Sequence, residues 1–542
     1  MKYILILFLV LSCSANAQLK FIIEDFEGFA DGNTDLGPNG VFVFGNMHAG
    51  IETQKPVHKS YSGDRDICIS KNGKEEFGGW GKGIGLNVEL DPYKDHLNFY
   101  VYQSVPGDTG TVKIELQEDD NGDNTYQKEM DDSWVYKYKL DGKSSWELVS
   151  IPLSGFRDDN YGGDGVFNVN YREGKLMCFI MTFQNAARYK EGESWYFDFI
   201  CFSQGKLPVG NALFDAPVVS PGGYCSLGAW SKEGNMANFT DIASAFEKNF
   251  KPEWDKNLGV VHFFQPFAFD GGDQQNLYPS VERINKVIQQ GYMPMITLED
   301  HFVNSKSTLK QPNLYSIVEG HFDPFFTEWA KQIKQVKGTV LLRILHEFNG
   351  DWYPWCIVNN DKNPQLLITA FRRIHDIFNA QGVKNVKFIW CPNSMSWPQE
   401  NWNFIMNAYP GDDYVDYVGL DIYNGAGKDL SVWRSFRKEG IENYFIITQR
   451  LPTKPVFVCE TASRERESFE STASQDKAGW IRQTSEALST DMSGVRLFAW
   501  FNEKKTFRID TSPGSKTAYL EYILKNDHFK PGTSYIPLLV GR

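Results

Sequence analysis

The sequence has no excess of positive charge and no clustered cysteines. Its 542 residues include 55 Lys+Arg against 68 Asp+Glu, which gives a formal net charge of -13. Because a phosphate backbone is bound by clustered positive charge, we expect no nucleic-acid partner. Of the 8 cysteines, Cys13 falls in the N-terminal segment. The others are odd in number and lack the close spacing of a zinc site or a disulfide framework, so we expect buried thiols with at most one chance disulfide.

Long apolar runs are absent after the first residues. An apolar run over residues 4–11 is followed by the small residues Ala15 and Ala17. This pattern predicts a secretory signal peptide over residues 1–17. In the alternative, the segment ending at Cys13 is a bacterial lipoprotein site, and Cys13 carries a lipid anchor. Both alternatives predict a bacterial protein that is secreted, periplasmic or associated with the outer membrane. No later stretch approaches the ~18 apolar residues of a spanning helix.

The chain is too long for one core, and its pattern changes along the sequence. Roughly 100–200 residues per domain implies two to four domains. Residues 20–204 contain short alternating runs between Gly-, Asp- and Asn-rich turns, which predicts an all-β sandwich. Residues 205–221 are rich in proline and glycine and form the predicted linker. Residues 222–530 alternate strand-like and helix-like segments, and residues 531–542 are left as a C-terminal tail.

The segment 222–530 has the spacing of a (β/α)₈ TIM barrel. Its helix-length intervals each accommodate the crossover of a βαβ unit of roughly 30 or more residues. One helix is well marked, because Asn363 can cap it, Pro364 fits its first position and Gly382 follows its end. Eight apolar strand-like runs begin near Tyr224, Leu258, Tyr292, Val340, Val386, Val415, Pro455 and Val495.

Two glutamates follow apolar strand-like runs, where a carboxylate is expensive to bury without a partner or a purpose. Glu347 ends the fourth run and Glu460 the seventh. These strands lie on roughly opposite sides of a barrel, so the two glutamates can face each other across its mouth. Hydrolysis of a glycosidic bond needs one carboxylic acid and one carboxylate. Strand alternation predicts that each glutamate shares a face with the residues two and four before it, namely Leu345 and Arg343, and Val458 and Val456.

Aromatic residues near the strand ends suit a sugar site. These are Trp352, Trp355, Tyr423 and Trp500. The alternatives are structural: Glu347 can be the ion-pair partner of Arg343, and Trp352 and Trp355 can be core residues. His301, after the third strand, and His346 can each contact substrate or fix a loop. A metalloenzyme is not favoured, because no two histidines share ligand spacing.

The run 346–355, His-Glu-Phe-Asn-Gly-Asp-Trp-Tyr-Pro-Trp, resembles the acid/base segment of glycoside hydrolase family 26. These are retaining (β/α)₈ endo-β-glycanases that include β-1,4-mannanases, lichenases and β-1,3-xylanases. The resemblance covers about residues 222–530. It implies Glu347 as acid/base, Glu460 as nucleophile and no cofactor for catalysis. It also implies that Trp352 and Trp500 bind the sugar. The residues that it implies as support for the two glutamates are Arg343, His346, Asp421 and Tyr423. We expect Tyr423 to hydrogen-bond Glu460, with Arg343 and Asp421 as a polar layer beneath.

A few positions in the segment 346–355 bear on which polysaccharide is the substrate. Mannanases of the family usually have Met or Ala where Phe348 stands, and often two aromatic residues where Tyr353 and Pro354 stand. The segment therefore resembles lichenase-type members, although most family members act on β-1,4-mannan. We expect a monomer that hydrolyses neutral β-1,3-1,4-glucan or β-1,4-mannan. The alternatives are a β-1,3-xylanase of the same family and a non-catalytic glycan-binding surface protein.

The N-terminal segment resembles, more weakly, the galactose-binding-like jelly rolls of carbohydrate-binding modules. Its first and last strands look like the paired terminal strands of that fold. Such modules often hold a structural calcium, and the resemblance implies Glu27 and Asp198 as ligands. The loop 119–124 looks like a calcium loop but lacks the closing Glu, because Met130 stands there. We interpret it as an acidic hairpin turn. Trp80, together with Tyr100 and Tyr102, can form a stacking face or belong to the core.

Overall fold

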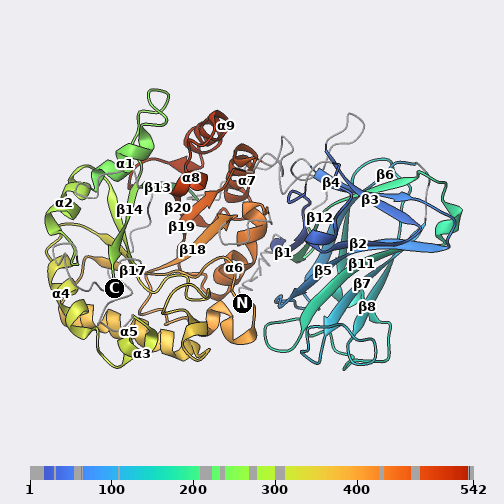
Figure 1. The fold of residues 1–542 in the computed structure, drawn as a ribbon, viewed down its shortest axis with the longest axis horizontal. Helices are drawn as coiled ribbons and strands as arrows, with labels where there is room; N and C mark the ends of the chain where they lie inside the picture. The colour runs from blue at the N-terminus through green and yellow to red at the C-terminus, as the bar shows by residue number, and fades with distance from the viewer. Residues whose placement is uncertain are drawn as a thin grey trace, which may run out of the picture.

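The computed structural model places two β-rich bodies side by side (Figure 1). It describes residues 17–29, 32–53, 63, 65–105, 107, 110–207, 223–231, 239–267, 277–299, 312–425, 433–465, 476–534 and 536. The predicted leader up to residue 16, including Cys13, lies outside the described residues, as does the predicted linker from residue 208 onward. In the described part of the chain no helix is long and apolar enough to cross a membrane.

The N-terminal body consists of two six-stranded antiparallel sheets. One sheet contains β1 (Gln18–Glu24), β3 (Met47–Thr53), β4 (Arg65–Lys71), β6 (Asp95–Gln103), β9 (Glu147–Pro152) and β12 (Ser194–Gln204). The other contains β2 (Val41–Gly45), β5 (Phe77–Leu86), β7 (Thr111–Asp119), β8 (Ser133–Lys139), β10 (Arg157–Asp158) and β11 (Lys175–Gln184). As expected for the terminal strands, β1 pairs with β12. Trp80 is fully buried between the sheets, against Phe179 and Phe197. It is therefore a core residue and does not form an exposed stacking face.

The second body is a closed parallel barrel, as the spacing of apolar runs predicted. Its strands pair in chain order, and β13 pairs with both β14 and β20, which closes the ring. The strands are β13 (Cys225–Ser231), β14 (Val260–Pro266), β15 (Met293–Glu299), β16 (Val340–Arg343), β17 (Val386–Trp390), β18 (Tyr417–Asn424), β19 (Val456–Ser463) and β20 (Val495–Asn502). The short β21 (Phe529–Lys530) pairs with β13.

Helices surround the barrel strands (Figure 1). They are α1 (Thr240–Glu247), α2 (Val281–Gln289), α3 (Leu314–Val318), α4 (Asp323–Ile333), α5 (Pro364–Ala380), α6 (Phe436–Arg450), α7 (Lys477–Ser489), α8 (Lys504–Phe507) and α9 (Pro513–Ala518). The marked helix is α5: the Asn363 side chain accepts a hydrogen bond from the Gln365 N–H, and Pro364 is its first residue. Its predicted apolar face, Leu367, Phe371, Ile374 and Phe378, is buried.

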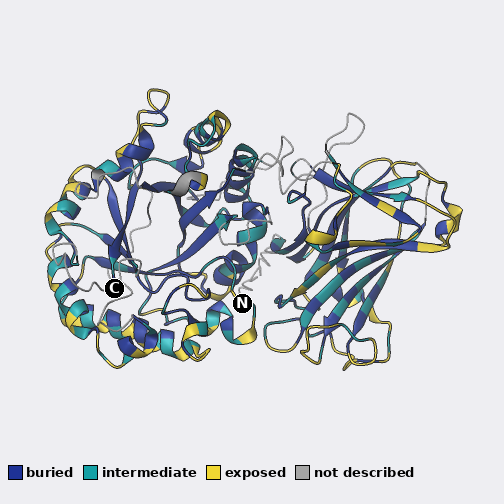
Figure 2. Ribbon diagram, viewed as in Figure 1, coloured by how far each residue is buried: buried dark blue, intermediate teal, exposed yellow. Residues whose placement is uncertain are grey.

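The apolar residues of the barrel form two layers, one inside the ring of strands and one outside it. One small cluster lies inside the ring and includes Leu341, Phe457, Cys459, Leu497 and Ala499. The larger cluster lies between the strands and the helices and contains their sequence neighbours, such as Leu342, Val458 and Trp500. Figure 2 shows the barrel strands as almost wholly buried, with exposure concentrated on the outer helices and loops.

The sandwich contacts the barrel through β1 and α6. Lys438 on α6 forms an ion pair of 2.7 Å with Glu24, and Ser435 donates a hydrogen bond of 2.7 Å to Asp25. Burial raises the pKa of Glu24, but the ammonium groups of Lys438 and Lys82 outweigh it and hold the pKa at about 2. On the other side of the contact, Tyr171 stacks on Phe404 with ring centroids 4.2 Å apart.

The seven cysteines in the described part of the chain are all free thiols. Five are buried and two, Cys68 and Cys178, are half-buried. The expectation of buried thiols is therefore confirmed for most of the set, and the described residues contain no disulfide.

Candidate active site

Glu347 lies in a turn beyond the end of a strand, which differs from the expected position. β16 ends at Arg343, and both Leu345 and Glu347 have a φ of 51°. A positive φ reverses the direction of the chain and ends strand alternation. Leu345 consequently packs in the outer layer, while Arg343 points inward. The prediction that Arg343, Leu345 and Glu347 share one strand face is wrong for this reason.

Glu460 reaches the inside of the barrel through a β-bulge. Val456 and Val458 belong to the outer layer, so simple alternation would send Glu460 outward with them. The pairing of β18 with β19 shifts register at this point, from Leu420 opposite Val458 to Asp421 opposite Glu460. A bulge inserts one residue and re-aims the side chains that follow it. The predicted face of Val456, Val458 and Glu460 is therefore wrong, although Glu460 does point toward Asp421 and Tyr423.

The Glu347 carboxyl is buried and bound by two uncharged donors. Its Oε1 accepts a hydrogen bond of 2.8 Å from Asn393 Nδ2, and its Oε2 accepts one of 2.7 Å from Trp352 Nε1. Burial and the negative charge of Asp421 raise the pKa of Glu347 to about 7, against the opposing effect of those hydrogen bonds. A carboxylic acid with this pKa is half protonated near neutral pH and can act as a proton donor.

The Glu460 carboxylate is held by a cation and a hydroxyl. Tyr423 donates a hydrogen bond of 2.6 Å to Glu460 Oε2, and the guanidinium of Arg343 forms an ion pair with the same carboxylate. Arg343 also bonds Asp421 and donates to Thr297 Oγ1 at 2.8 Å. Both contacts to Glu460 stabilise its charged form. The hydrogen bond of Tyr423 to Glu460 and the pair of Arg343 with Asp421 were expected from the sequence, whereas the ion pair of Arg343 with Glu460 was not.

The two glutamates belong to one electrostatic cluster. Burial first, and then the charges of Asp421 and Glu347, raise the pKa of Tyr423 well above its usual value. Tyr423 donates a hydrogen bond to Glu460. The charge of Glu347 therefore acts on the hydroxyl group that binds the Glu460 carboxylate. The structural alternative for Glu347, an ion pair with Arg343, is not what the structure shows: Arg343 pairs with Asp421 and Glu460.

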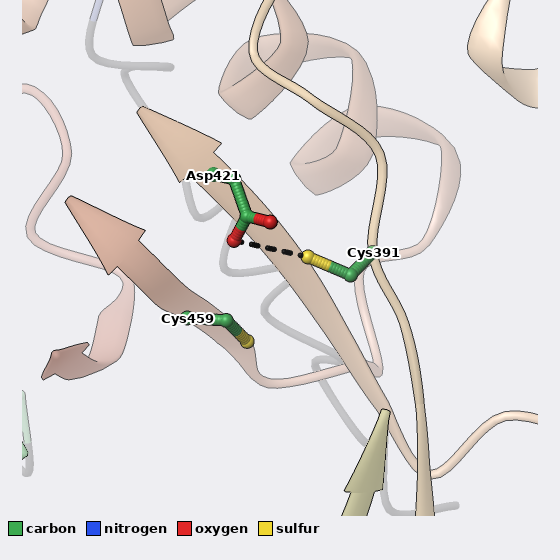
Figure 3. A group of neighbouring side chains, drawn as sticks. All are labelled: Cys391, Asp421 and Cys459. Carbon is green, nitrogen blue, oxygen red and sulfur yellow. Dashed lines mark hydrogen bonds between the residues drawn. The ribbon is translucent and has the colours of Figure 1, made fainter. Parts of the chain in front are cut away.

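A layer of sulfur and carboxylate lies beneath these groups. Cys391 directly follows β17, and its side chain lies close to those of Asp421 on β18 and Cys459 on β19 (Figure 3). The Cys391 thiol donates a hydrogen bond of 3.4 Å to Asp421 Oδ1, and burial raises its pKa well above the usual value. Two sulfurs and a carboxylate are also a metal-binding set, but the Arg343 guanidinium already lies against Cys391 and Asp421. This fixed positive charge opposes a bound cation, so the three residues do not fit a metal site.

His346 fixes the loop that carries Glu347. It is buried, and its Nε2 lies 3.1 Å from the hydroxyl of Tyr353. Tyr353 also donates a hydrogen bond of 3.2 Å to Glu299, at the end of β15. Of the two expected roles, contact with substrate or support of the loop, these bonds favour support.

The aromatic residues divide into one exposed ring and two core rings. Trp352 is 47% exposed and bonded to Glu347, so it can contact a sugar beside that carboxyl. Trp355 is fully buried, and its Nε1 donates to the His346 carbonyl at 2.7 Å. Trp500 is 1% exposed and packs in the outer layer against Trp480 and Tyr519. The expectation that Trp355 and Trp500 offer their faces to a sugar is therefore not met.

Strand alternation explains why the side chain of Trp500 points away from the candidate site. In β20, Leu497 and Ala499 point into the barrel, so Trp500 points out and Phe501 points in. The ring of Phe501 lies 5.8 Å from that of Tyr423 and 6.0 Å from that of Phe264. Phe501 is the aromatic residue of this strand that faces the candidate site.

Replacing Trp355 and Trp352 with alanine will separate a core role from a surface role. We expect Trp355→Ala to cost about 3–5 kcal/mol of unfolding free energy, because it opens a large cavity. Trp352→Ala removes a half-exposed ring, and we expect a loss of less than about 1 kcal/mol together with weaker substrate binding. Urea denaturation of both variants measures the difference. Equal losses would contradict the assignment of Trp355 to the core.

Some residues of the site were not foreseen in the sequence. Asn393 follows the end of β17 and binds Glu347, a position at which a polar residue could have been noticed. Thr297 and His262 bond each other at 2.8 Å, and burial and the charge of Arg343 hold the pKa of His262 well below its usual value. Trp397 is 60% exposed on the same loop as Asn393. His301, proposed as a sugar contact, lies outside the described residues.

The calcium site at Glu27 and Asp198 stays a prediction. Glu27 is bonded to neighbours in both the sandwich and the barrel. Its Oε1 accepts a hydrogen bond from the Arg65 N–H at 2.9 Å, and its Oε2 accepts one from Gln483 at 3.0 Å. Asp198 is buried on β12. Within the described ranges, neither residue belongs to a cluster of three side chains whose ligand atoms could hold one ion.

Part of the chain is similar to a known family of glycoside hydrolases. Residues 223–438 match the model of glycosyl hydrolase family 26. Endoglucanase H of Acetivibrio thermocellus is 35% identical over 282 residues, 51% of this chain and 28% of its own length. A mannan endo-1,4-beta-mannosidase of Bacillus subtilis is 29% identical over 117 residues, 20% of this chain and 31% of its own length.

The matched part of the chain thus spans less than a third of each of these two curated relatives. Among solved structures, the Bacillus subtilis mannanase man26 aligns with 61% of this chain and 92% of its own, at 16% identity and a TM-score of 0.42. Residues 223–438 are thus similar to glycosyl hydrolase family 26.

Proposed function

We propose that this chain is a retaining endo-β-glycanase acting on a neutral polysaccharide. The proposal rests on the contrast between two buried glutamates. Glu347 is bound by uncharged donors and has a pKa of about 7, whereas Glu460 is bound by Arg343 and Tyr423. One protonated and one charged carboxyl group are what double displacement at a glycosidic bond requires. The family match and relatives named endoglucanase and mannan endo-1,4-beta-mannosidase support it.

Each carboxyl group has one part in the proposed reaction. Glu347 donates its proton to the glycosidic oxygen while Glu460 attacks the anomeric carbon, so the leaving sugar departs and a covalent glycosyl-enzyme forms. Glu347, now ionised, then takes a proton from water, whose oxygen attacks the same carbon and releases Glu460. Tyr423 and Arg343 hold the Glu460 carboxylate in place before the attack. Trp352 holds Glu347 and lies half exposed beside it.

The pH dependence of kcat/KM should follow the protonation of the Glu347 carboxyl group. The first step needs the protonated acid, so kcat/KM should fall as the pH rises above the pKa of about 7. In Glu347→Gln the basic limb should disappear, and kcat/KM on polysaccharide should drop by about 10²–10⁴-fold. A pH profile of both proteins between pH 5 and 9, buffered at constant ionic strength, makes the comparison. A basic limb that survives in Glu347→Gln would assign it to another group.

The substrate proposed is β-1,3-1,4-glucan or β-1,4-mannan, with β-1,3-xylan as the alternative. Phe348 is fully buried, with its ring 5.2 Å from that of Trp390, so it can influence substrate choice only through the shape of the loop. A net charge of -13 does not favour repeated carboxylates, which supports a neutral polymer.

Product analysis after incubation with lichenan, glucomannan, galactomannan and β-1,3-xylan tests the substrate. We expect oligosaccharides from lichenan or the mannans. Cleavage of galactomannan but not lichenan would exclude the mixed-linkage preference, and preference for xylan would exclude both proposed substrates. The absence of reducing ends from all four would instead favour a glycan-binding protein without activity.

A further inference from the structure

An acidic cluster lies in the sandwich, away from the paired glutamates. Glu118 is near the end of β7, Asp120 follows that strand, and Asp132 directly precedes β8. Each of the three offers a carboxylate oxygen, and these oxygens all lie within 4.8 Å of one another. Glu118 and Asp132 are fully buried. Among the described residues, no lysine or arginine forms an ion pair with any of the three.

Buried oxygen atoms without donors mark the same place. Asp132 is 0% exposed; its Oδ2 accepts a hydrogen bond from the Gly165 N–H at 2.9 Å, whereas its Oδ1 has no partner. Asp120 is arranged in the same way: its Oδ2 accepts from the Asp132 N–H at 2.7 Å, and its Oδ1 is buried without a partner. The neutral amide oxygen of Asn168 is a third such atom. A buried acceptor without a donor is expensive, so either a bound cation or protons on the carboxyl groups would stabilise this cluster.

Two glycines allow the oxygens to gather. A Cβ at Gly163 would collide with Asp132 Oδ1 and lie 2.6 Å from Asp120 Oδ2, and Gly163 has a φ of +70°. A Cβ at Gly174 would lie 2.8 Å from Glu118 Oε1 and 2.9 Å from Asn168 Oδ1. The chain therefore brings carboxylates from the β7–β8 loop and an amide oxygen from the segment 163–174 into one confined volume.

We propose that Glu118, Asp120, Asp132 and the Asn168 side chain form a calcium site. Ca²⁺ takes oxygen ligands from carboxylates, amides and backbone carbonyls in a flexible arrangement. The set contains no nitrogen or sulfur ligand, which disfavours zinc and copper. The site shares only Asp120 with the loop 119–124 considered in the sequence. In that loop, Asp119 accepts hydrogen bonds from the N–H groups of residues 122, 123 and 124, as a hairpin turn does.

The competing explanation is that the carboxyl groups of the cluster are protonated, and a test must distinguish these protons from a bound cation.

The site has a consequence for the contact with the barrel. The segment that supplies Asn168 continues to Tyr171, which stacks on Phe404 of the barrel. Asn170, between them, donates to the Asn168 carbonyl at 2.7 Å. A cation bound at the cluster would therefore tie the β7–β8 loop to the segment that docks on the barrel.

Titration of the full chain with Tb³⁺ and Ca²⁺ after removal of metals with EDTA tests the proposal. Trp134 donates a hydrogen bond of 3.0 Å to Glu118, so excitation of tryptophan should sensitise bound Tb³⁺. We expect one saturable site, displacement of Tb³⁺ by Ca²⁺, and a rise in Tm of about 5–10 °C at calcium near 100 times Kd. Asp132→Asn should weaken calcium binding by at least about tenfold, since affinity follows ligand charge.

Glu129→Gln is the matched control, because it removes an exposed carboxylate from the same loop without touching the cluster. It should bind like the wild type. If Asp132→Asn does not fold, Asn168→Ala removes a neutral ligand and should also weaken binding. The proposal is overturned if the metal-free wild type shows no saturable binding up to 10 mM Ca²⁺, or if both cluster variants bind as tightly as Glu129→Gln. The first of these results would favour retained protons.

Discussion

Glu460→Ala should lower kcat on a soluble β-glycan by at least about 10⁴-fold, because it removes the nucleophile of the proposed reaction. The fold should survive, since Arg343 keeps its contact with Asp421. Reducing-end release measures the rate, and circular dichroism checks the fold. Glu319→Gln, which changes an exposed carboxylate outside the site, serves as the control. Turnover of Glu460→Ala near the wild-type value would remove Glu460 from the mechanism.

Arg343→Met should be among the most destabilising substitutions in the barrel. The guanidinium is 0% exposed and pairs with both Asp421 and Glu460, whose carboxylates would lose their cation. Breaking a buried pair by removing one partner costs about 3–5 kcal/mol. Activity should fall as well, because the charged form of Glu460 loses its partner.

Urea denaturation of Arg343→Met should be compared with that of Arg373→Met. Arg373 pairs with Asp323, but both side chains are 38% exposed, so we expect a loss of only about 0–1 kcal/mol. Similar losses of unfolding free energy in the two variants would show that Asp421 and Glu460 do not need the charge of Arg343 for stability.

The architecture could be predicted from the sequence because it depends on regular patterns. Eight apolar runs at the spacing of βαβ units correspond to the eight strands, β13 to β20, that close the barrel. The Asn363–Pro364 start of α5 is a local signal, since capping depends on neighbouring residues alone. The pair of Arg343 with Asp421 was expected because a buried arginine needs a carboxylate partner, and the bond of Tyr423 to Glu460 was expected from the family resemblance.

The predictions of side-chain direction that failed concern places where the chain departs from regular strand alternation. Alternation along β19 is interrupted by a bulge, and the turn after β16 places Leu345 and Glu347 at positive φ. Neither feature has a signal in residue types, because the surrounding barrel imposes both. The error at Trp500 has the opposite cause: β20 is regular there, and applying alternation would have selected Phe501.

The central claim is that Glu347 and Glu460 divide the chemistry between them, and rescue with azide tests it most directly. A small anion can replace a missing carboxylate, and the anomer of the glycosyl azide shows the face from which it attacked. On an aryl β-glycoside with a good leaving group, Glu460→Ala should give the α-glycosyl azide, because azide attacks from the vacated side. Glu347→Ala should give the β-glycosyl azide, because azide attacks the glycosyl-enzyme. NMR of the products identifies each anomer, and exchanged anomers, or no azide product from either variant, would contradict the account.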